Sequence, residues 1–160
     1  MGSRRKGRIL AFQALYSWDA GQDRKTSVKE DSTKENSIKQ NSSPADLVPE
    51  GLLDFSWASQ VPDEEMTAFS RLLVTGTIEN IAAVDEMIQK HLDNWELKRL
   101  NKVDLAIMRM SVYTLMFQND LPPSIIIDEA IDISKEYGTD DSFRFVNGVL
   151  DGIRKTIEKP

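Results

Sequence analysis

Apolar residues recur at helical spacing close to the start of the chain. Ile9, Phe12 and Tyr16 follow one another at steps of three and four, and Leu15 lies beside them. This spacing places the four side chains in one stripe along a helix. It predicts an amphipathic helix over residues 4–18 whose apolar stripe packs against the rest of the protein.

The pattern changes abruptly after this helix. Lys, Ser, Glu, Asn, Asp and Thr dominate from Gln22 onward, and no aromatic residue occurs before Phe55. A segment of this composition buries too little apolar surface to order itself. We therefore expect one domain over residues 1–160, with a flexible polar insertion at about residues 22–50 that is most simply a tolerated surface loop.

Helical periodicity returns beyond the polar segment. Pro62 and Asp63, followed by two Glu residues, indicate the start of a helix. Apolar residues then keep the helical period to about Trp95, and Gly76 allows either a break or a close helix crossing in the middle. The segment that begins at Asn101 is apolar in nearly every direction, which predicts a central, buried helix.

Two further helices follow a stop made by a pair of adjacent prolines. The first runs over residues 125–137, and we expect Gly138 to end it in the left-handed conformation. The last begins near Asp140 or Asp141 and carries apolar residues at helical intervals as far as Ile157. The chain then holds about seven helices and no convincing strand, so the predicted fold class is all-α.

Charges are segregated along the chain. Its 160 residues carry 20 Lys plus Arg against 26 Asp plus Glu, a net charge of −6. Arg4, Arg5, Lys6 and Arg8 nevertheless lie together at the start, and no acidic residue interrupts them before Asp19. Cations at a helix N-terminus oppose the helix dipole, so their placement needs another reason. A cationic edge on an anionic body indicates a phosphate-binding arm, although charge alone equally fits a disordered, solubilising end.

Residue counts exclude several kinds of chemistry. The chain has no Cys and only one His, His91, which excludes thiolate nucleophiles and multi-histidine metal sites. Neither a GxxxxGK nor a GxGxxG phosphate loop occurs, and we expect no enzyme activity, no cofactor and no metal. No apolar run is long enough for a membrane span, and the first one lacks the cleavage site of a secretory leader. We expect a soluble, cytoplasmic protein.

Two side chains on the first helix favour nucleic acid over other anions. Tyr16 offers a ring on which a base can stack, and Gln13 offers an amide that can bind a base edge, both on the helix that carries the cations. Core packing explains Tyr16 about equally well, because it shares the stripe of Ile9 and Phe12. The residues alone therefore indicate nucleic-acid binding by this helix and leave the role of Tyr16 open.

Four stretches together resemble one known family. These are SRRKGRILAFQALYSW at the start, residues 103–113, the helix containing IDEAIDISKEYG, and the closing DSFRFVNGVLDGIRK. In this order they are similar to the NusB family of bacterial transcription antitermination factors. The resemblance covers most of the chain except residues 22–60, which are longer and more polar than the family's usual linker.

The resemblance implies a fold, partners and a site. The family's fold is two packed helical bundles, and its members bind single-stranded boxA RNA of ribosomal RNA leaders together with the ribosomal protein NusE. The heterodimer then joins a complex on elongating RNA polymerase. Whether the free protein is a monomer or a homodimer stays open. Carried over to this sequence, the RNA surface comprises Arg4, Arg5, Lys6, Arg8, Gln13 and Tyr16, joined by Asp141, Arg144 and Phe145.

Structural roles also explain several residues of the last helix. Phe145 has the spacing of a core residue, Asp141 can cap the helix, and Arg144 can be ordinary surface. We interpret Asn147 and Gly148 as structural, with the asparagine buried and the glycine admitting a neighbouring helix.

Two other functions remain as alternatives. One is a NusB-like RNA-binding domain that serves an rRNA cytosine methyltransferase, and the absence of Cys and of a following cofactor-binding half speaks against it. The other is a purely protein-binding helical adaptor whose cations meet an acidic partner. A comparison of specific with scrambled RNA at two salt concentrations separates the adaptor from an RNA-binding factor.

Overall fold

The chain folds into helices joined by turns. The computed structural model describes residues 2–29, 51–58, 62–93, 95–118 and 120–158, and no strand occurs among them. A short 3-10 turn lies at Leu97–Arg99. The α-helices are α1 Gly2–Lys29, α2 Glu64–Glu79, α3 Ile81–Lys90, α4 Lys102–Phe117, α5 Pro123–Tyr137 and α6 Ser142–Glu158.

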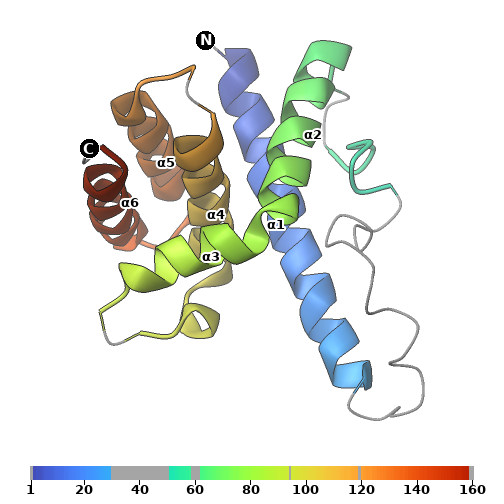
Figure 1. Cartoon of the computed structure of the whole chain (residues 1–160). Coiled ribbons are helices and arrows are strands. Elements are labelled where there is room, and N and C mark those ends of the chain that lie inside the picture. Colours follow the sequence, from blue (N-terminus) through green and yellow to red (C-terminus); the bar gives the residue numbers. More distant parts are fainter. Residues whose placement is uncertain (1, 30–50, 59–61, 94, 119, 159–160) are drawn as a thin grey trace.

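Helix α4 forms the centre of the molecule (Figure 1). It contacts each of the other five helices, and every residue from Asp104 to Leu115 is buried. Helices α1 and α2 pack together on one side of α4, and α5 and α6 pack together on the other. This confirms the all-α class with its two groups of packed helices. No helix in the described ranges is both long and apolar enough to cross a membrane.

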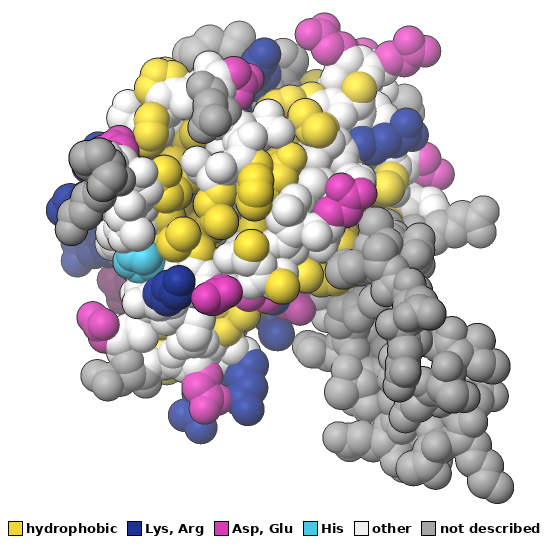
Figure 2. Space-filling view, viewed as in Figure 1, with side chains coloured by type: hydrophobic (Ala, Val, Ile, Leu, Met, Phe, Trp, Pro, Cys, Tyr) yellow, Lys and Arg dark blue, Asp and Glu magenta, His cyan; other side chains and the backbone are white. Residues whose placement is uncertain are grey.

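Apolar side chains also reach the surface. On the face shown in Figure 2, they gather over α4 between α6 and α2, and charged side chains lie mainly around them. Among the exposed apolar residues are Leu72 of α2 and Phe117 of α4.

Helix α1 is longer than the apolar pattern predicts. Ala11, Phe12 and Leu15 are buried as the stripe requires. The helix continues beyond Gln22 to Lys29, so the predicted start of the polar insertion is wrong. Helix elongation needs only backbone hydrogen bonds once a helix has begun, and Gln, Arg and Lys tolerate it well. Residues 30–50, the remainder of the predicted insertion, lie outside the described residues.

Gly76 marks a close crossing, and the helix breaks elsewhere. Asp63 caps α2 by accepting a hydrogen bond from the Met66 amide at 2.7 Å, as the sequence indicated. The helix passes through Gly76 and ends at Glu79. A Cβ at Gly76 would overlap the Tyr113 ring of α4, so the glycine lets α2 approach the central helix.

Gly138 ends α5, but without the expected left-handed conformation. Its φ of −92° and ψ of −171° are extended values that any residue can adopt. A Cβ there would lie 2.6 Å from the Ser142 Cβ and 2.7 Å from the Ser134 carbonyl oxygen. Close approach of α6 to the end of α5, rather than backbone conformation, therefore requires this glycine.

One buried cation links three helices, and the sequence pattern did not predict it. Arg109 of α4 is 8% exposed and makes a bidentate ion pair with Asp85 of α3, at 2.8 and 2.9 Å. Its third nitrogen lies 3.4 Å from Asp19 of α1. Burial acts to lower the pKa of Arg109, but the two carboxylates outweigh it and the pKa is raised.

A buried carboxyl in the first turn of α4, that of Asp104, has no nearby opposite charge to offset its burial. Asp104 is 6% exposed, and its Oδ1 has no hydrogen-bond partner among the described residues. Burial raises the pKa of Asp104, and a hydrogen bond with Ser142 only partly opposes the change. The charged form of Asp104 is therefore disfavoured in the folded protein.

Asp104→Asn should consequently change how stability depends on pH. Because the folded protein binds this proton more tightly than the unfolded chain, the contribution of Asp104 to the stability of the wild type falls as pH rises above about 4, the ordinary carboxyl pKa. The variant has no such loss, so its free energy of unfolding relative to wild type should increase between pH 4 and pH 7. Urea unfolding at both pH values measures this difference. A constant difference would show that Asp104 titrates normally.

Candidate nucleic-acid interface

The four cations at the start of α1 have different surroundings. Arg4 and Lys6 are exposed, Arg5 is half-buried and Arg8 is buried. We expected all four to project toward a ligand. The helix period does not explain the difference, because Arg4 and Arg8 are one turn apart on the same side of α1 and both lie over the Phe69 ring. Arg8 follows Gly7 at the crossing with α2, whereas Arg4 lies one turn closer to the start of the helix.

Arg5 is held by two carboxylates of α5. Its Nε and Nη2 donate to the Glu129 carboxylate at 3.0 and 3.1 Å, and Nη2 also donates to Asp132 at 2.8 Å. The hydrogen bond and charge of Glu129 raise the pKa of Arg5. The guanidinium is thus neutralised within the protein and joins α1 to α5.

Arg8 is covered where α1 crosses α2. Gly7 permits the crossing, since a Cβ there would lie 2.7 Å from Phe69, and its carbonyl accepts a hydrogen bond from Ser70 at 2.9 Å. The Arg8 guanidinium lies over the Phe69 ring, 5.4 Å from its centre, and that of Arg4 lies 5.6 Å from the same centre. Burial lowers the pKa of Arg8. Only 7% of Arg8 remains exposed, which leaves little of it to contact a ligand.

Tyr16 and Gln13 lie on the more open side of α1. Tyr16 is 44% exposed, so its ring is available for stacking and is not a core residue. Gln13 is half-buried.

The other predicted residues lie at the start of α6 or immediately before it. Asp141 and Arg144 are exposed, and the Arg144 guanidinium lies 5.5 Å from the Phe143 ring centre. Phe145 is partly buried and packs against the core, as its spacing predicted, and its role in RNA binding stays a prediction.

The structural roles expected of two neighbours in α6 are wrong. Asn147 is exposed, and a Cβ at Gly148 would meet no atom within 4 Å. Both residues point away from the helices against which α6 packs, because the buried stripe of α6 runs through residues 146, 149, 150 and 153.

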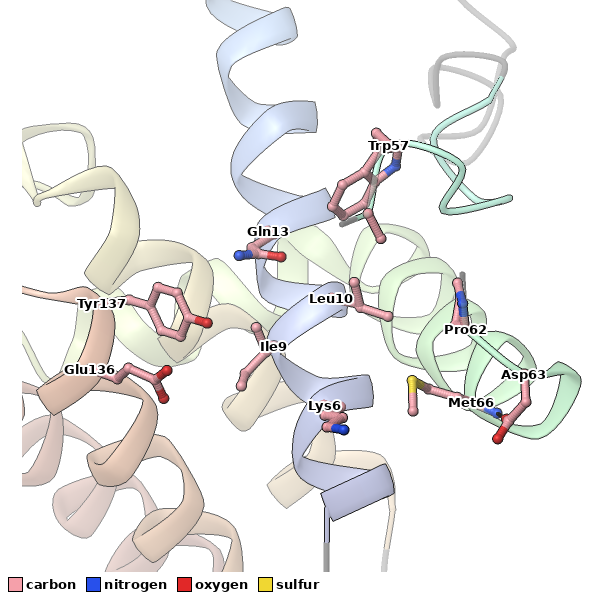
Figure 3. Close-up of a pocket in the computed structure, with 11 residues that line it drawn as sticks. Lys6, Ile9, Leu10, Gln13, Trp57, Pro62, Asp63, Met66, Glu136 and Tyr137 are labelled. Atoms are coloured by element: carbon pink, nitrogen blue, oxygen red, sulfur yellow. Dashed lines mark hydrogen bonds between the residues drawn. The ribbon is translucent and has the colours of Figure 1, made fainter. Parts of the chain in front are cut away.

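A hollow of about 710 Å³ opens along α1 (Figure 3). On one side lie Glu136 and Tyr137 at the end of α5, and on the other lie Trp57 and the start of α2. Sequence reasoning missed Trp57 and Tyr137 as site residues. The spacing of Leu52 and Phe55, which are both buried, could have indicated that Trp57 faces outward. The α1 residues in the wall are Lys6, Ile9, Leu10 and Gln13.

The chemistry gathered here suits non-covalent binding. Exposed cations bind phosphates, while aromatic rings and amides bind bases. No group of three or more His, Cys, Asp or Glu side chains is placed to hold a metal ion in the part of the chain that the structure describes.

Arg5→Ala should reduce stability modestly, and more at low salt. The substitution removes the ion pairs with Glu129 and Asp132, which are 21% and 47% exposed and so partly screened. We expect a loss of about 1 kcal/mol in the free energy of unfolding. Urea unfolding at low and high ionic strength, roughly 20 mM and 500 mM salt, measures the loss of stability and its dependence on salt. A loss that does not depend on salt would indicate packing instead of charge.

Comparison with known proteins places this arrangement in a family. Residues 5–155 match the NusB family. The transcription antitermination protein NusB of Treponema denticola is 46% identical over 94% of this chain and 95% of its own length. The structure of T. maritima NusB is 32% identical, covers 95% of this chain and 90% of its own, and has a TM-score of 0.72. A complex of antitermination factors NusB and NusE with double-stranded RNA has the same fold, with 24% identity, a TM-score of 0.70 and 98% coverage of both chains. The chain belongs to the NusB family.

Proposed function

We propose that this protein is an RNA-binding transcription antitermination factor. Together with the ribosomal protein NusE, it binds single-stranded boxA-type RNA of ribosomal RNA leaders and joins the elongating RNA polymerase in the cytoplasm. It acts by binding and makes or breaks no bond. The observation that carries this proposal is that two exposed cations, Arg4 and Lys6, and the exposed Tyr16 lie on one helix of an acidic protein.

Relatives support the antitermination role. The Treponema denticola protein, 46% identical, is a transcription antitermination protein, and the match extends over nearly the whole of both chains. The same RNA surface would continue across α5 to Arg144 and Asp141, which are both exposed at the start of α6.

The side chains favour an unpaired strand over a duplex. Tyr16 and Gln13 offer a stacking face and a base-reading amide, and both need bases that are neither paired nor stacked on one another. A protein partner such as NusE has the apolar surface over α4 available for docking (Figure 2).

Fluorescence anisotropy with labelled RNA tests the function. We expect a boxA-type single strand to bind more tightly than a scrambled strand or a duplex of the same sequence, and NusE to strengthen that preference. If Arg4, Lys6 and Arg144 each contact a phosphate, log affinity should fall against log salt with a slope of about −2. Equal affinity for all three RNAs with a slope near zero would instead support a protein-binding adaptor.

The individual cations should contribute unequally to this slope. Arg4→Ala and Lys6→Ala should each flatten it by about 0.7, because each removes one exposed charge from the strand. Arg5→Ala is the matched control, since its charge is already paired with Glu129 and Asp132. An equal change in all three variants would mean that RNA displaces the α5 carboxylates from Arg5.

A further inference from the structure

The hollow along α1 is part of a longer trough. A second hollow of about 220 Å³ shares Gln13 and Trp57 with the first and extends to Ser17 and Leu52. From Lys6 to Ser17 the helix rises about 16 Å. We call this surface, lined by α1 between the end of α5 and residues 51–58, the α1 trough.

One aromatic wall of the α1 trough is fixed in place. Trp57 is 43% exposed, and its indole N–H donates to the Leu52 carbonyl at 3.1 Å. Its ring also packs against Phe55, which is fully buried, with 5.6 Å between ring centres. Trp57 is therefore partly exposed and held in a set orientation, as a stacking platform requires.

The opposite wall carries a second such ring. Tyr137 is 38% exposed and meets Phe12 of α1 edge to face, at 5.2 Å between ring centres. Burial and the neighbouring Glu136 raise the pKa of Tyr137, so its hydroxyl stays protonated at neutral pH. In Figure 3 this hydroxyl points toward α1, with Gln13 between the two rings.

The polar groups of the α1 trough suit bases better than phosphates. The amide of Gln13 can donate and accept, and a carboxylate such as Glu136 accepts from the amino group of a base. Glu136 and Asp63 would repel a phosphate placed between them. Lys6 lies at one end of the trough, one residue from Arg5 and two from Arg4, where a strand's backbone can pass.

We propose that the α1 trough receives unstacked bases of the RNA strand, which stack on Trp57 and Tyr137 while Gln13 contacts their edges. This inference rests on the proposed function and adds Trp57 and Tyr137 to the RNA-binding surface. Charge complementarity supports this occupant, because the exposed cations at the start of α1 adjoin a cavity whose walls combine aromatic and apolar side chains with a few polar groups. Base insertion also explains why single-stranded RNA is expected to bind more tightly than a duplex, since the paired bases of a duplex cannot enter the α1 trough.

Trp57→Leu tests the proposal, with Trp95→Leu as its matched control. Both tryptophans are exposed, at 43% and 57%, but Trp95 does not line the trough. Loss of base stacking should weaken binding of the boxA-type single strand by about 5- to 150-fold in Trp57→Leu. Trp95→Leu should bind as the wild type does, and both variants should keep the salt slope because no cation has changed.

RNA with abasic positions identifies the group that occupies the α1 trough. Removing the relevant bases should weaken wild-type binding by a similar factor, and Trp57→Leu should lose little more on the abasic strand. The Trp57→Leu substitution and the removal of the bases form a double-mutant cycle. If their losses in binding free energy simply add, the bases do not contact Trp57 and the proposal is overturned. Trp57→Phe keeps a ring and should recover most of the affinity, which separates stacking from a general disturbance of residues 51–58.

The outcomes distinguish this inference from the proposed function. If wild-type protein fails to prefer boxA-type RNA over scrambled RNA, the proposed function itself fails. If the preference and salt slope are present but Trp57→Leu binds RNA normally, only the inference fails. If Trp57→Leu weakens binding of NusE and leaves RNA binding unchanged, the α1 trough is a protein-docking surface and the inference is overturned.

Discussion

Arg109→Met is expected to reduce the free energy of unfolding by about 3–5 kcal/mol. The substitution keeps an apolar stem of similar length but removes the bidentate partner of Asp85, while Asp19 retains its ion pair with Lys102 at 3.3 Å. An unpaired carboxylate in a largely buried position costs more than the ion pair itself contributes. Chemical denaturation and thermal melting measure the loss, which corresponds to a melting temperature lower by about 10 °C or more for a domain of this size.

The control for Arg109→Met is a more exposed ion pair within a single helix, α6. Arg154 contacts Asp151 at 2.6 Å, but the two side chains are 32% and 36% exposed. Arg154→Met should therefore change stability by less than about 1 kcal/mol. Comparable losses in the two variants would contradict the view that Arg109 links α1, α3 and α4 through a buried charge cluster.

Gly76→Val should be nearly as damaging, by about 3 kcal/mol, for a different reason. The new side chain would overlap the Tyr113 ring, which is 5% exposed and packs at 5.6 Å against Phe117. Because a packed ring cannot move aside freely, α2 must shift away from α4. Urea unfolding measures the loss. A partial recovery in the double variant Gly76→Val with Tyr113→Ala would locate the clash at this ring.

Gly148→Val is the matched control for that substitution. Gly148 also lies inside a helix, but a Cβ there meets no atom within 4 Å. A helix favours Val over Gly by a few tenths of a kcal/mol, so this variant should be as stable as the wild type or slightly more stable. A large loss in Gly148→Val would mean that a β-branched side chain destabilises these helices even where no atom lies near it, and the overlap with Tyr113 would then not explain the loss in Gly76→Val.

The sequence predicts the helices well because their burial follows a simple period. Phe12 and Leu15 of α1 and the whole middle of α4 are buried where the apolar pattern requires. Predictions that depended on tertiary neighbours were less successful. The pattern of apolar and polar residues in the sequence does not show that Gly138 makes room for Ser142. It also does not show that Asn147 lies on the exposed side of α6.

The predicted site shows the same limit. The cluster of cations is evident in the sequence, but the carboxylates that neutralise Arg5 lie more than 120 residues away, in α5. Trp57 could be recognised as a residue of an ordered segment, yet only the fold brings it opposite Tyr137. Whether the nine predicted residues bind RNA is a question for the binding experiments proposed above.

The contacts of Arg5 and Gly7 have a consequence for the thermodynamics of association. Together they tie the first turns of α1 to α5 and α2, so the neighbouring Arg4 and Lys6 project from a preorganised helix and not from a fluctuating tail. A basic tail that folds on contact loses backbone entropy at that moment, whereas this arm has already lost it during folding. The ordering cost of complex formation then falls mainly on the flexible strand.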